Sequence, residues 1–217
     1  MSEQISSVML VDDHPLLRKG LKQLLALEDE LEVIAEASNG QDAIKLAAEL
    51  DPDLIILDLN MQGMDGLETL KRMRDEGVTS RIVMLTVSDA DEDIVKAISN
   101  GADGYLLKDT DPEVLLDQIK KALEGKMVLS EAITQVLATA LRRPQAKTPA
   151  ELNSLTNREY EILHLIAKGM SNKVIARELN ISDGTVKVHG KHLLKKLGLR
   201  SRVEAAVWMV NQQGGKL

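Results

Sequence analysis

The sequence predicts a doubly wound α/β domain with a parallel sheet, followed by a separate all-α domain. Over residues 1–125, short apolar runs alternate with segments of helical period, a pattern typical of repeated β-α units. Beyond residue 154 only helical patterns continue, and a stretch that contains Pro144 and Pro149 separates the two parts. With 217 residues, the chain is long enough to build a core in each part.

Five short apolar runs are the expected strands of the first domain. Leu54–Leu57 is apolar throughout, as expected of a strand that is buried on both faces of a parallel sheet. The helical segments between the runs favour right-handed crossovers, which keep the strands parallel. We therefore expect a five-stranded sheet in the flavodoxin-like order 2-1-3-4-5, built from Val8–Val11, Val33–Ala35, Leu54–Leu57, Ile82–Val87 and Tyr105–Leu107.

The helices of the first domain are marked by apolar periodicity and by capping signals. Between residues 16 and 25, leucines recur every three or four positions. Ser38–Gln41 and Thr110–Glu113 have the spacing of capping boxes, and Ser130–Leu141 is one further helical pattern. Because the chain has no Phe and a single Trp, we expect Leu, Ile, Val, Ala and Met to form both cores.

The second domain is expected to contain four helices. Thr156–Glu159 has capping-box spacing, and the helix that it opens would end at Gly169. Lys173–Leu179 and Asp183–Leu197 are joined by about three residues, which is the helix-turn-helix arrangement, and a fourth helix would follow Ser201. We expect the domains to span residues 1–128 and 155–217, joined by a helix and linker over residues 129–154.

Composition excludes several classes of protein. The chain has no cysteine, so disulfides and thiolate metal sites are excluded. Met1–Ser7 carries no basic residue, unlike the start of a signal peptide. No apolar run approaches the roughly 18 residues that a membrane span requires. These features predict a soluble, cytoplasmic protein.

The net charge of −7 conceals an asymmetry between the two parts of the chain. Residues 151–217 hold 11 Lys and Arg against 6 Asp and Glu, whereas residues 1–150 hold 16 against 28. A basic C-terminal part on an acidic chain suggests that this part contacts nucleic acid. Chance scatter of surface charge is the alternative interpretation of these numbers.

Acidic side chains follow two of the predicted strands. Asp12 and Asp13 come after the first strand, and Asp58 comes after the third. In the order 2-1-3-4-5 these strands are neighbours, so the three carboxylates should meet at the carboxyl edge of the sheet. Two like charges about 4 Å apart repel by ~4 kcal/mol at an effective dielectric constant near 20. The cluster therefore needs a cation, and oxygen ligands favour Mg²⁺.

Thr86 and Lys108 end two further strands at the same edge. A hydroxyl and an ammonium can both contact a phosphoryl group, and a divalent cation offsets its charge. Asp58 is then a candidate nucleophile that accepts this group. An Asp at a strand end can also serve as a helix cap, but the whole set favours a phosphoryl site. The four histidines show no metal-ligand spacing on one face, so we expect structural or surface roles for His14, His164, His189 and His192.

Residues 8–125 resemble a response-regulator receiver domain. The matching motifs are Leu10–Asp13, Leu57–Met61, Gly63–Gly66 and Gly101–Lys108. The resemblance implies that a sensor histidine kinase phosphorylates Asp58. Gln62 stands where receivers usually have Pro, a departure that removes no chemical group.

The same resemblance implies roles for the residues around Asp58. Mg²⁺ would be bound by Asp13, Asp58 and the carbonyl of Asn60, with help from Asp12. Thr86 and Tyr105 would form the switch pair, and Lys108 would contact the phosphoryl group.

The predicted helix Asp183–Leu197 has two distinct faces. At 100° per residue, one stripe would pack on the other helices, and it contains Val186, Gly190, Leu193 and Leu197. Val188 points away from this stripe among basic residues, where it would suit contact with a thymine methyl group in the major groove. Lys187 and Lys191 flank Val188 and could reach base edges. A solvated lysine face is the alternative interpretation.

Residues 155–210 resemble the LuxR/FixJ-type helix-turn-helix through Leu155–Glu159, Gly169–Ala176, Thr185–His189 and Arg200–Ala206. The resemblance implies that Asp183–Leu197 is the recognition helix. Base contacts are expected from Lys187, Val188 and Lys191, and contacts to the DNA backbone from Lys173, Arg177, His192 and Lys195. Gly190 departs from the apolar residue that is usual at its position.

The complete chain is thus expected to be a two-component transcription regulator and not an enzyme. It resembles the nitrate- and nitrite-responsive members of this family most closely in Thr185–Lys196 and Ser201–Trp208. Phosphorylation would either free the recognition helix or favour a homodimer on double-stranded DNA.

Two alternative functions are an Asp-nucleophile phosphatase and a protein-interaction module. The phosphatases resemble one another in a second Asp two residues after the nucleophile, where this chain has Asn60, which cannot donate a proton in the same way. An interaction module would bind DNA weakly, with no dependence on salt, Lys187 or Lys191.

Overall fold

The computed structural model describes residues 5–88, 90–124, 128–129 and 154–214. The predicted helix Ser130–Leu141 and nearly all of the predicted linker lie outside these residues. Within them, no helix is long and apolar enough to cross a membrane.

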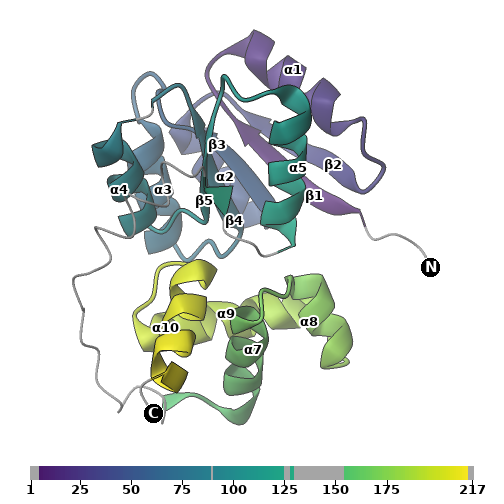
Figure 1. The fold of residues 1–217 in the computed structure, drawn as a ribbon, viewed down its shortest axis with the longest axis vertical. Helices are drawn as coiled ribbons and strands as arrows, with labels where there is room; N and C mark the ends of the chain where they lie inside the picture. The colour runs from purple at the N-terminus through teal and green to yellow at the C-terminus, as the bar shows by residue number, and fades with distance from the viewer. Residues whose placement is uncertain (1–4, 89, 125–127, 130–153, 215–217) are drawn as a thin grey trace.

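The first domain is built on a parallel sheet in the strand order β2-β1-β3-β4-β5-β6 (Figure 1). The first five strands confirm the predicted order 2-1-3-4-5. A sixth strand of two residues pairs with β5 and was not predicted, because so short a segment has no recognisable alternation. The strands are β1 (Ser6–Val11), β2 (Leu31–Ala37), β3 (Leu54–Asp58), β4 (Arg81–Thr86), β5 (Gly104–Leu107) and β6 (Val128–Leu129).

Helices cover both faces of this sheet, and each face has its own apolar core. Side chains of α2, α3 and α4 pack on one face with Met9, Ile55 and Tyr105. Side chains of α1 and α5 pack on the other face with Leu10 and Ile56. The alternation within β1 and β3 therefore serves two apolar cores. The helices are α1 (Pro15–Leu25), α2 (Gly40–Leu50), α3 (Gly66–Asp75), α4 (Asp91–Ser99) and α5 (Pro112–Leu123).

Two of the predicted helix caps are displaced by one residue. Asn39, rather than Ser38, caps α2 by accepting a hydrogen bond from the backbone N–H of Asp42. Asp111, rather than Thr110, caps α5 by accepting one from Glu113. The predicted spacing located both helices but chose the wrong member of two adjacent polar residues, since either residue type can cap a helix.

The second domain contains α7 (Asn157–Ala167), α8 (Asn172–Glu178), α9 (Asp183–Leu197) and α10 (Arg202–Gly214). The capping box predicted at Thr156 and Glu159 is present in full at the start of α7. Ser182 caps α9, which ends at Gly198 in the left-handed conformation. The core of this domain is formed by apolar side chains from all four helices, including Ile162, Ile175 and Leu193.

The helical domain lies beneath the sheet, at the amino ends of its strands (Figure 1). The contacting receiver-side segments precede strands, among them Asp51 and Asp53 before β3 and Ser99 before β5. The acidic cluster lies at the opposite, carboxyl edge. A signal between the two must therefore cross the length of the sheet.

Candidate functional site

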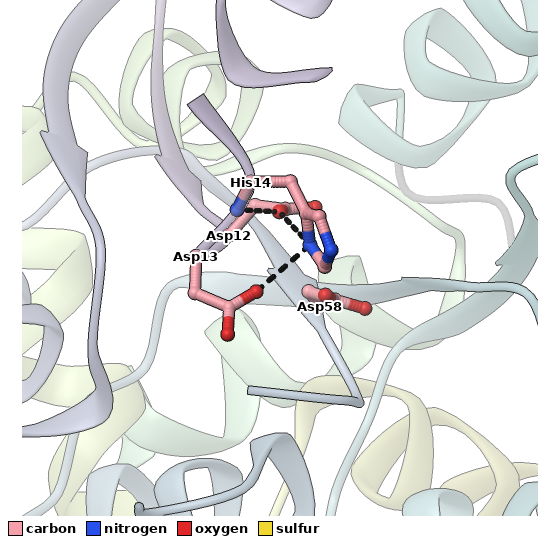
Figure 2. Close-up of side chains that lie close together, drawn as sticks. All are labelled: Asp12, Asp13, His14 and Asp58. Carbon is pink, nitrogen blue, oxygen red and sulfur yellow. Dashed lines mark hydrogen bonds and ion pairs between the residues drawn. The ribbon is translucent and has the colours of Figure 1, made fainter. Parts of the chain in front are cut away.

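Three carboxylates meet at the carboxyl edge of the sheet, as the strand order predicts. Val11 pairs with Leu57, so Asp12 and Asp58 emerge side by side from neighbouring strands. Both residues are almost fully buried, with 3% and 2% of their surface exposed. One oxygen from each of Asp12, Asp13 and Asp58, together with a ring nitrogen of His14, lie within 4.8 Å of one another (Figure 2).

Lys108 joins two of these carboxylates. Its Nζ lies 2.8 Å from an oxygen of Asp12 and 2.8 Å from Oδ2 of Asp58. Burial nevertheless raises the pKa of the Asp58 carboxyl above its ordinary value. The neighbouring Asp12 charge acts in the same direction and the Lys108 ammonium acts against it. Asp58 therefore carries a charge that its surroundings only partly compensate.

Backbone N–H groups orient the three carboxylates. The N–H of His14 donates to Oδ1 of Asp12 at 2.7 Å, and the N–H of Gln62 donates to Oδ2 of Asp13 at 3.0 Å. The N–H of Asn60 donates more weakly to Oδ1 of Asp58, at 3.3 Å. The loop that contains Gln62, where receivers usually have Pro, thus contributes a donor that Pro would lack.

His14 belongs to this cluster, although the sequence argument assigned it a structural or surface role. Its side chain is 69% exposed, yet its Nδ1 lies 2.8 Å from Asp13 and 3.3 Å from Asp12. The four histidines show no metal-ligand spacing on one face of the chain. The available signal was different, namely that His14 directly follows two acidic residues at a strand end.

The donor set fits a hard divalent cation such as Mg²⁺. Oδ1 of Asp13 is a buried carboxylate oxygen that lies 2.8 Å from Nδ1 of His14, and the buried Oδ2 of Asp58 lies 2.8 Å from the Lys108 ammonium. Carboxylate oxygens are preferred Mg²⁺ ligands, and buried like charges are stabilised by a cation between them. Asn60 lies at the same edge, two residues after Asp58, as predicted.

Thr86 and Tyr105 are linked through one loop beside the acidic cluster. The Thr86 hydroxyl accepts a hydrogen bond from the N–H of Ser88 at 3.1 Å, and the buried Tyr105 donates its hydroxyl proton to the Ser88 carbonyl at 3.0 Å. The backbone N–H of Lys108 donates to the Thr86 carbonyl at 2.8 Å. A change in the Thr86 rotamer would thus reach the Tyr105 ring through Ser88, a residue that the sequence argument did not include.

The two faces of α9 are buried and exposed as predicted. Val186, Gly190, Leu193 and Leu197 are buried on the packing side, while Val188 is 53% exposed. Lys191, His192 and Lys195 are also exposed. An exposed apolar side chain among basic ones is a common feature of surfaces that read a DNA groove.

Two of the predicted DNA-contacting lysines bind the first domain instead of solvent. Nζ of Lys187 lies 3.1 Å from the Asp51 carboxylate and donates to the Asp51 carbonyl at 2.7 Å. Nζ of Lys173 lies 2.9 Å from the Asp53 carboxylate. Burial disfavours the charge on Lys187, but Asp51 and Asp183 outweigh that effect and raise the Lys187 pKa. Both lysines of the helical domain are thus paired with carboxylates of the first domain.

Two family models match the two domains. Residues 8–120 match the response regulator receiver domain, and residues 153–209 match the bacterial regulatory proteins of the luxR family. The chain is 55% identical over 208 residues to the nitrate/nitrite response regulator protein NarL of Escherichia coli K12, covering 96% of each chain. It is 52% identical over 209 residues to NarP of the same organism, again covering 96% of each chain.

A solved structure gives the same assignment. The response regulator ChrA of a heme-sensing two-component system is 34% identical, with a TM-score of 0.51 over 96% of this chain and 98% of ChrA. These relatives are regulators and not enzymes, so the phosphatase alternative is excluded. The chain therefore belongs to the two-component response regulators that join a receiver domain to a LuxR-type DNA-binding domain, and it is a transcription regulator.

Proposed function

We propose that Asp58 accepts a phosphoryl group from a sensor histidine kinase. The observation that carries this proposal is the buried Asp58 carboxylate, held between Asp12 and Lys108 at the carboxyl edge of the sheet. An oxygen of Asp58 would attack the phosphorus of a phosphohistidine, and the bond from phosphorus to the imidazole nitrogen would break. Lys108 would then pair with the transferred group, and Thr86 would donate to it.

Mg²⁺ is proposed to bind at Asp12, Asp13, Asp58 and the Asn60 carbonyl. When bound, it would offset the negative charge of the phosphoryl group. Asp13 is the carboxylate best placed to bind Mg²⁺, because Lys108 pairs with Asp12 and Asp58 but not with Asp13. The kinase and the cation are thus two separate partners of one site.

The proposed output is sequence-specific binding of double-stranded DNA through α9. We propose that Lys187, Val188 and Lys191 contact bases, and that Lys173, Arg177, His192 and Lys195 contact the DNA backbone. Both Lys173 and Lys187 pair with receiver carboxylates in this conformation. These pairs favour a mechanism in which phosphorylation frees the recognition helix, with a homodimer on the DNA as a second, compatible step.

The proposed signal is nitrate or nitrite. It rests on relatives in Escherichia coli and Haemophilus influenzae that carry nitrate/nitrite response in their names and are 52–55% identical to this chain. The proposed domain limits are residues 1–128 and 155–217, joined by residues 129–154, and the proposed location is the cytoplasm.

Phosphotransfer from purified sensor kinases tests the central proposal. We expect radiolabel from the kinase to reach the wild-type chain and Asp75→Asn, an exposed aspartate on α3, but not Asp58→Asn. Labelling of Asp58→Asn at the wild-type rate would overturn the proposal.

Anisotropy of labelled operator-type DNA then tests the output. Phosphorylated wild-type chain should bind more tightly than unphosphorylated chain, and log affinity should fall linearly with log salt. Binding that is weak, insensitive to salt and unchanged by Lys191→Ala would instead support the protein-interaction module.

A further inference from the structure

The acidic cluster contains one ligand that is not an oxygen. His14 is the N-cap residue of α1, with extended backbone angles (φ −91°, ψ 106°), and Pro15 follows it. The proline restricts the backbone of the residue before it, and the N–H of His14 is tied to Asp12. The backbone of His14 is therefore held beside the carboxylates, and Figure 2 shows its ring next to the side chains of Asp12, Asp13 and Asp58.

The spacing of the side-chain atoms suits coordination of one ion. Nδ1 of His14 lies 2.8 Å from Asp13 and 3.3 Å from Asp12. Ligands bound at about 2.0–2.2 Å to a tetrahedral ion lie about 3.3 Å from one another. The 2.8 Å pair would need to open slightly, and the farther pairs of the cluster, up to 4.8 Å apart, would need to close.

The partners of each atom show which oxygens are available. Lys108 approaches Oδ2 of Asp12 and Oδ2 of Asp58, whereas His14 approaches Oδ1 of Asp12. Oδ1 of Asp13 is buried and is held by no hydrogen bond among the described residues, although Nδ1 of His14 lies 2.8 Å away. A cation between His14 and Asp13 would supply the missing partner to both.

We propose that His14 makes this cluster a mixed imidazole–carboxylate site that binds ions such as Zn²⁺ and Co²⁺ more tightly than Mg²⁺. Imidazole is a poor ligand for Mg²⁺ but a good one for the later first-row ions. The ligands would be Nδ1 of His14 and oxygens of Asp12, Asp13 and Asp58. The proposal rests on the same cluster as the proposed phosphorylation site.

Co²⁺ is the most informative probe, because nitrogen ligands change its visible absorption. We expect the full chain to bind Co²⁺ with new visible bands and at least about tenfold more tightly than Mg²⁺, with both affinities measured by calorimetry. His14→Gln should lose most of the bands and at least about tenfold in Co²⁺ affinity, the scale of loss of a ligand-shell residue, while its Mg²⁺ affinity changes less than about twofold. His164→Gln is the matched control and should behave as wild type.

The outcomes separate this inference from the proposed function. Unchanged Co²⁺ bands in His14→Gln, or bands lost equally in His164→Gln, would overturn the metal proposal while leaving phosphotransfer to Asp58 untouched. Labelling of Asp58→Asn would overturn the function without affecting the Co²⁺ result. Circular dichroism checks that each variant folds. If His14→Gln does not fold, broadening of one histidine ring signal of the wild-type chain by Co²⁺, reversed by excess Mg²⁺, supports the site, and equal broadening of all four overturns it.

Discussion

At the scale of single residues, the site is defined by a charge that the fold does not fully accommodate. Asp58 is buried beside a second buried aspartate and receives one ammonium partner, Lys108. Its raised pKa expresses this imbalance, with burial as the main cause. A fold selected for stability alone would have placed a neutral residue there. The imbalance favours binding of a cation and reaction with a phosphoryl group, both of which relieve it.

Asp58→Asn should therefore stabilise the receiver domain at neutral pH. A carboxyl group whose pKa is raised in the folded chain adds most to the free energy of unfolding at pH values below its ordinary pKa. This added stability is lost as pH rises through the raised pKa. Asn does not ionise, so the gain in melting temperature over wild type should appear as pH rises from about 4 to about 8. Thermal unfolding followed by far-UV circular dichroism measures this.

Asp75→Asn provides the control for Asp58→Asn, because Asp75 is exposed and lies away from the cluster. It should change the melting temperature little at any pH. A destabilised Asp58→Asn at neutral pH would show that the ion pair with Lys108 outweighs the burial of the charge.

Residue-level prediction from sequence succeeded where position on a strand decided the outcome. Asp12, Asp58 and Lys108 were located because parallel strands deliver their carboxyl ends to one edge. His14 was missed because the approach of its ring to Asp12 and Asp13 depends on its side-chain rotamer, which no pattern in the sequence shows. Strand order is visible in apolar periodicity, but side-chain direction is not.

At the scale of elements, two glycines differ in the space that a side chain would find at their positions in helices. Gly190 lies on the buried stripe of α9, and a Cβ built there meets nothing within 4 Å outside its own helix backbone. Gly66 begins α3, and a Cβ built there would lie 2.1 Å from the carbonyl oxygen of Asp58. The first glycine leaves space in the helical core, whereas the second allows α3 to approach the backbone of Asp58 and Leu59.

Gly190→Ala should stabilise the helical domain by about 1 kcal/mol, because alanine lowers the entropy cost of the helix and fills open space. Urea unfolding followed by fluorescence of Trp208, the single tryptophan of the chain, reports on this domain. Gly20→Ala is a matched control on the receiver, where a Cβ also meets nothing within 4 Å. It should leave the Trp208 transition in place, and a lower midpoint for Gly190→Ala would show that α9 cannot accept the methyl group.

Gly66→Ala should destabilise the receiver domain by roughly 1–3 kcal/mol, the usual cost of overpacking. The added methyl group would meet backbone atoms of Asp58 and Leu59, which cannot rotate away as a flexible side chain can. We expect a lower melting temperature by circular dichroism and slower phosphotransfer to Asp58. Wild-type stability in Gly66→Ala would mean that the start of α3 can move without loss.

At the scale of the whole molecule, the two domains contact each other through ion pairs, and the lysines of these pairs carry positive charges that DNA would also attract. Lys187 and Lys173 come from the basic domain, and Asp51 and Asp53 come from the loop before β3. The loops at this edge were assigned no function from sequence, because ion pairs between segments over 100 residues apart leave no local pattern. The charge asymmetry of the chain predicted a basic DNA-binding part. It did not predict that lysines of this basic part would form ion pairs with the acidic part.

The pKa directions agree with a docking contact that needs both partners charged. Burial raises the Asp53 pKa, but hydrogen bonds from Ser7 and Lys173 outweigh it and lower the pKa overall. Ionised Asp53 therefore stabilises the folded, docked chain at pH values above the ordinary aspartate pKa. This stabilisation is lost as pH falls through the lowered pKa. The pKa of Lys187 is raised, so charged Lys187 stabilises the folded, docked chain at pH values below the ordinary lysine pKa. This stabilisation is lost as pH rises through the raised pKa. The docked form should therefore hold across the neutral range.

Removing both carboxylates should free the basic face without phosphorylation. Each ion pair is worth about 0.2–1 kcal/mol, so Asp51→Asn combined with Asp53→Asn should shift docking by roughly 1 kcal/mol and raise DNA affinity about fivefold. Anisotropy of labelled DNA at low salt measures this, and the gain should shrink as salt screens the exposed parts of the contact. The charge-matched control combines Glu92→Gln and Glu113→Gln, two exposed residues on α4 and α5. An equal gain in this control would assign the effect to net charge, whereas a gain confined to residues 51 and 53 would show that receiver carboxylates occupy the place of DNA phosphates.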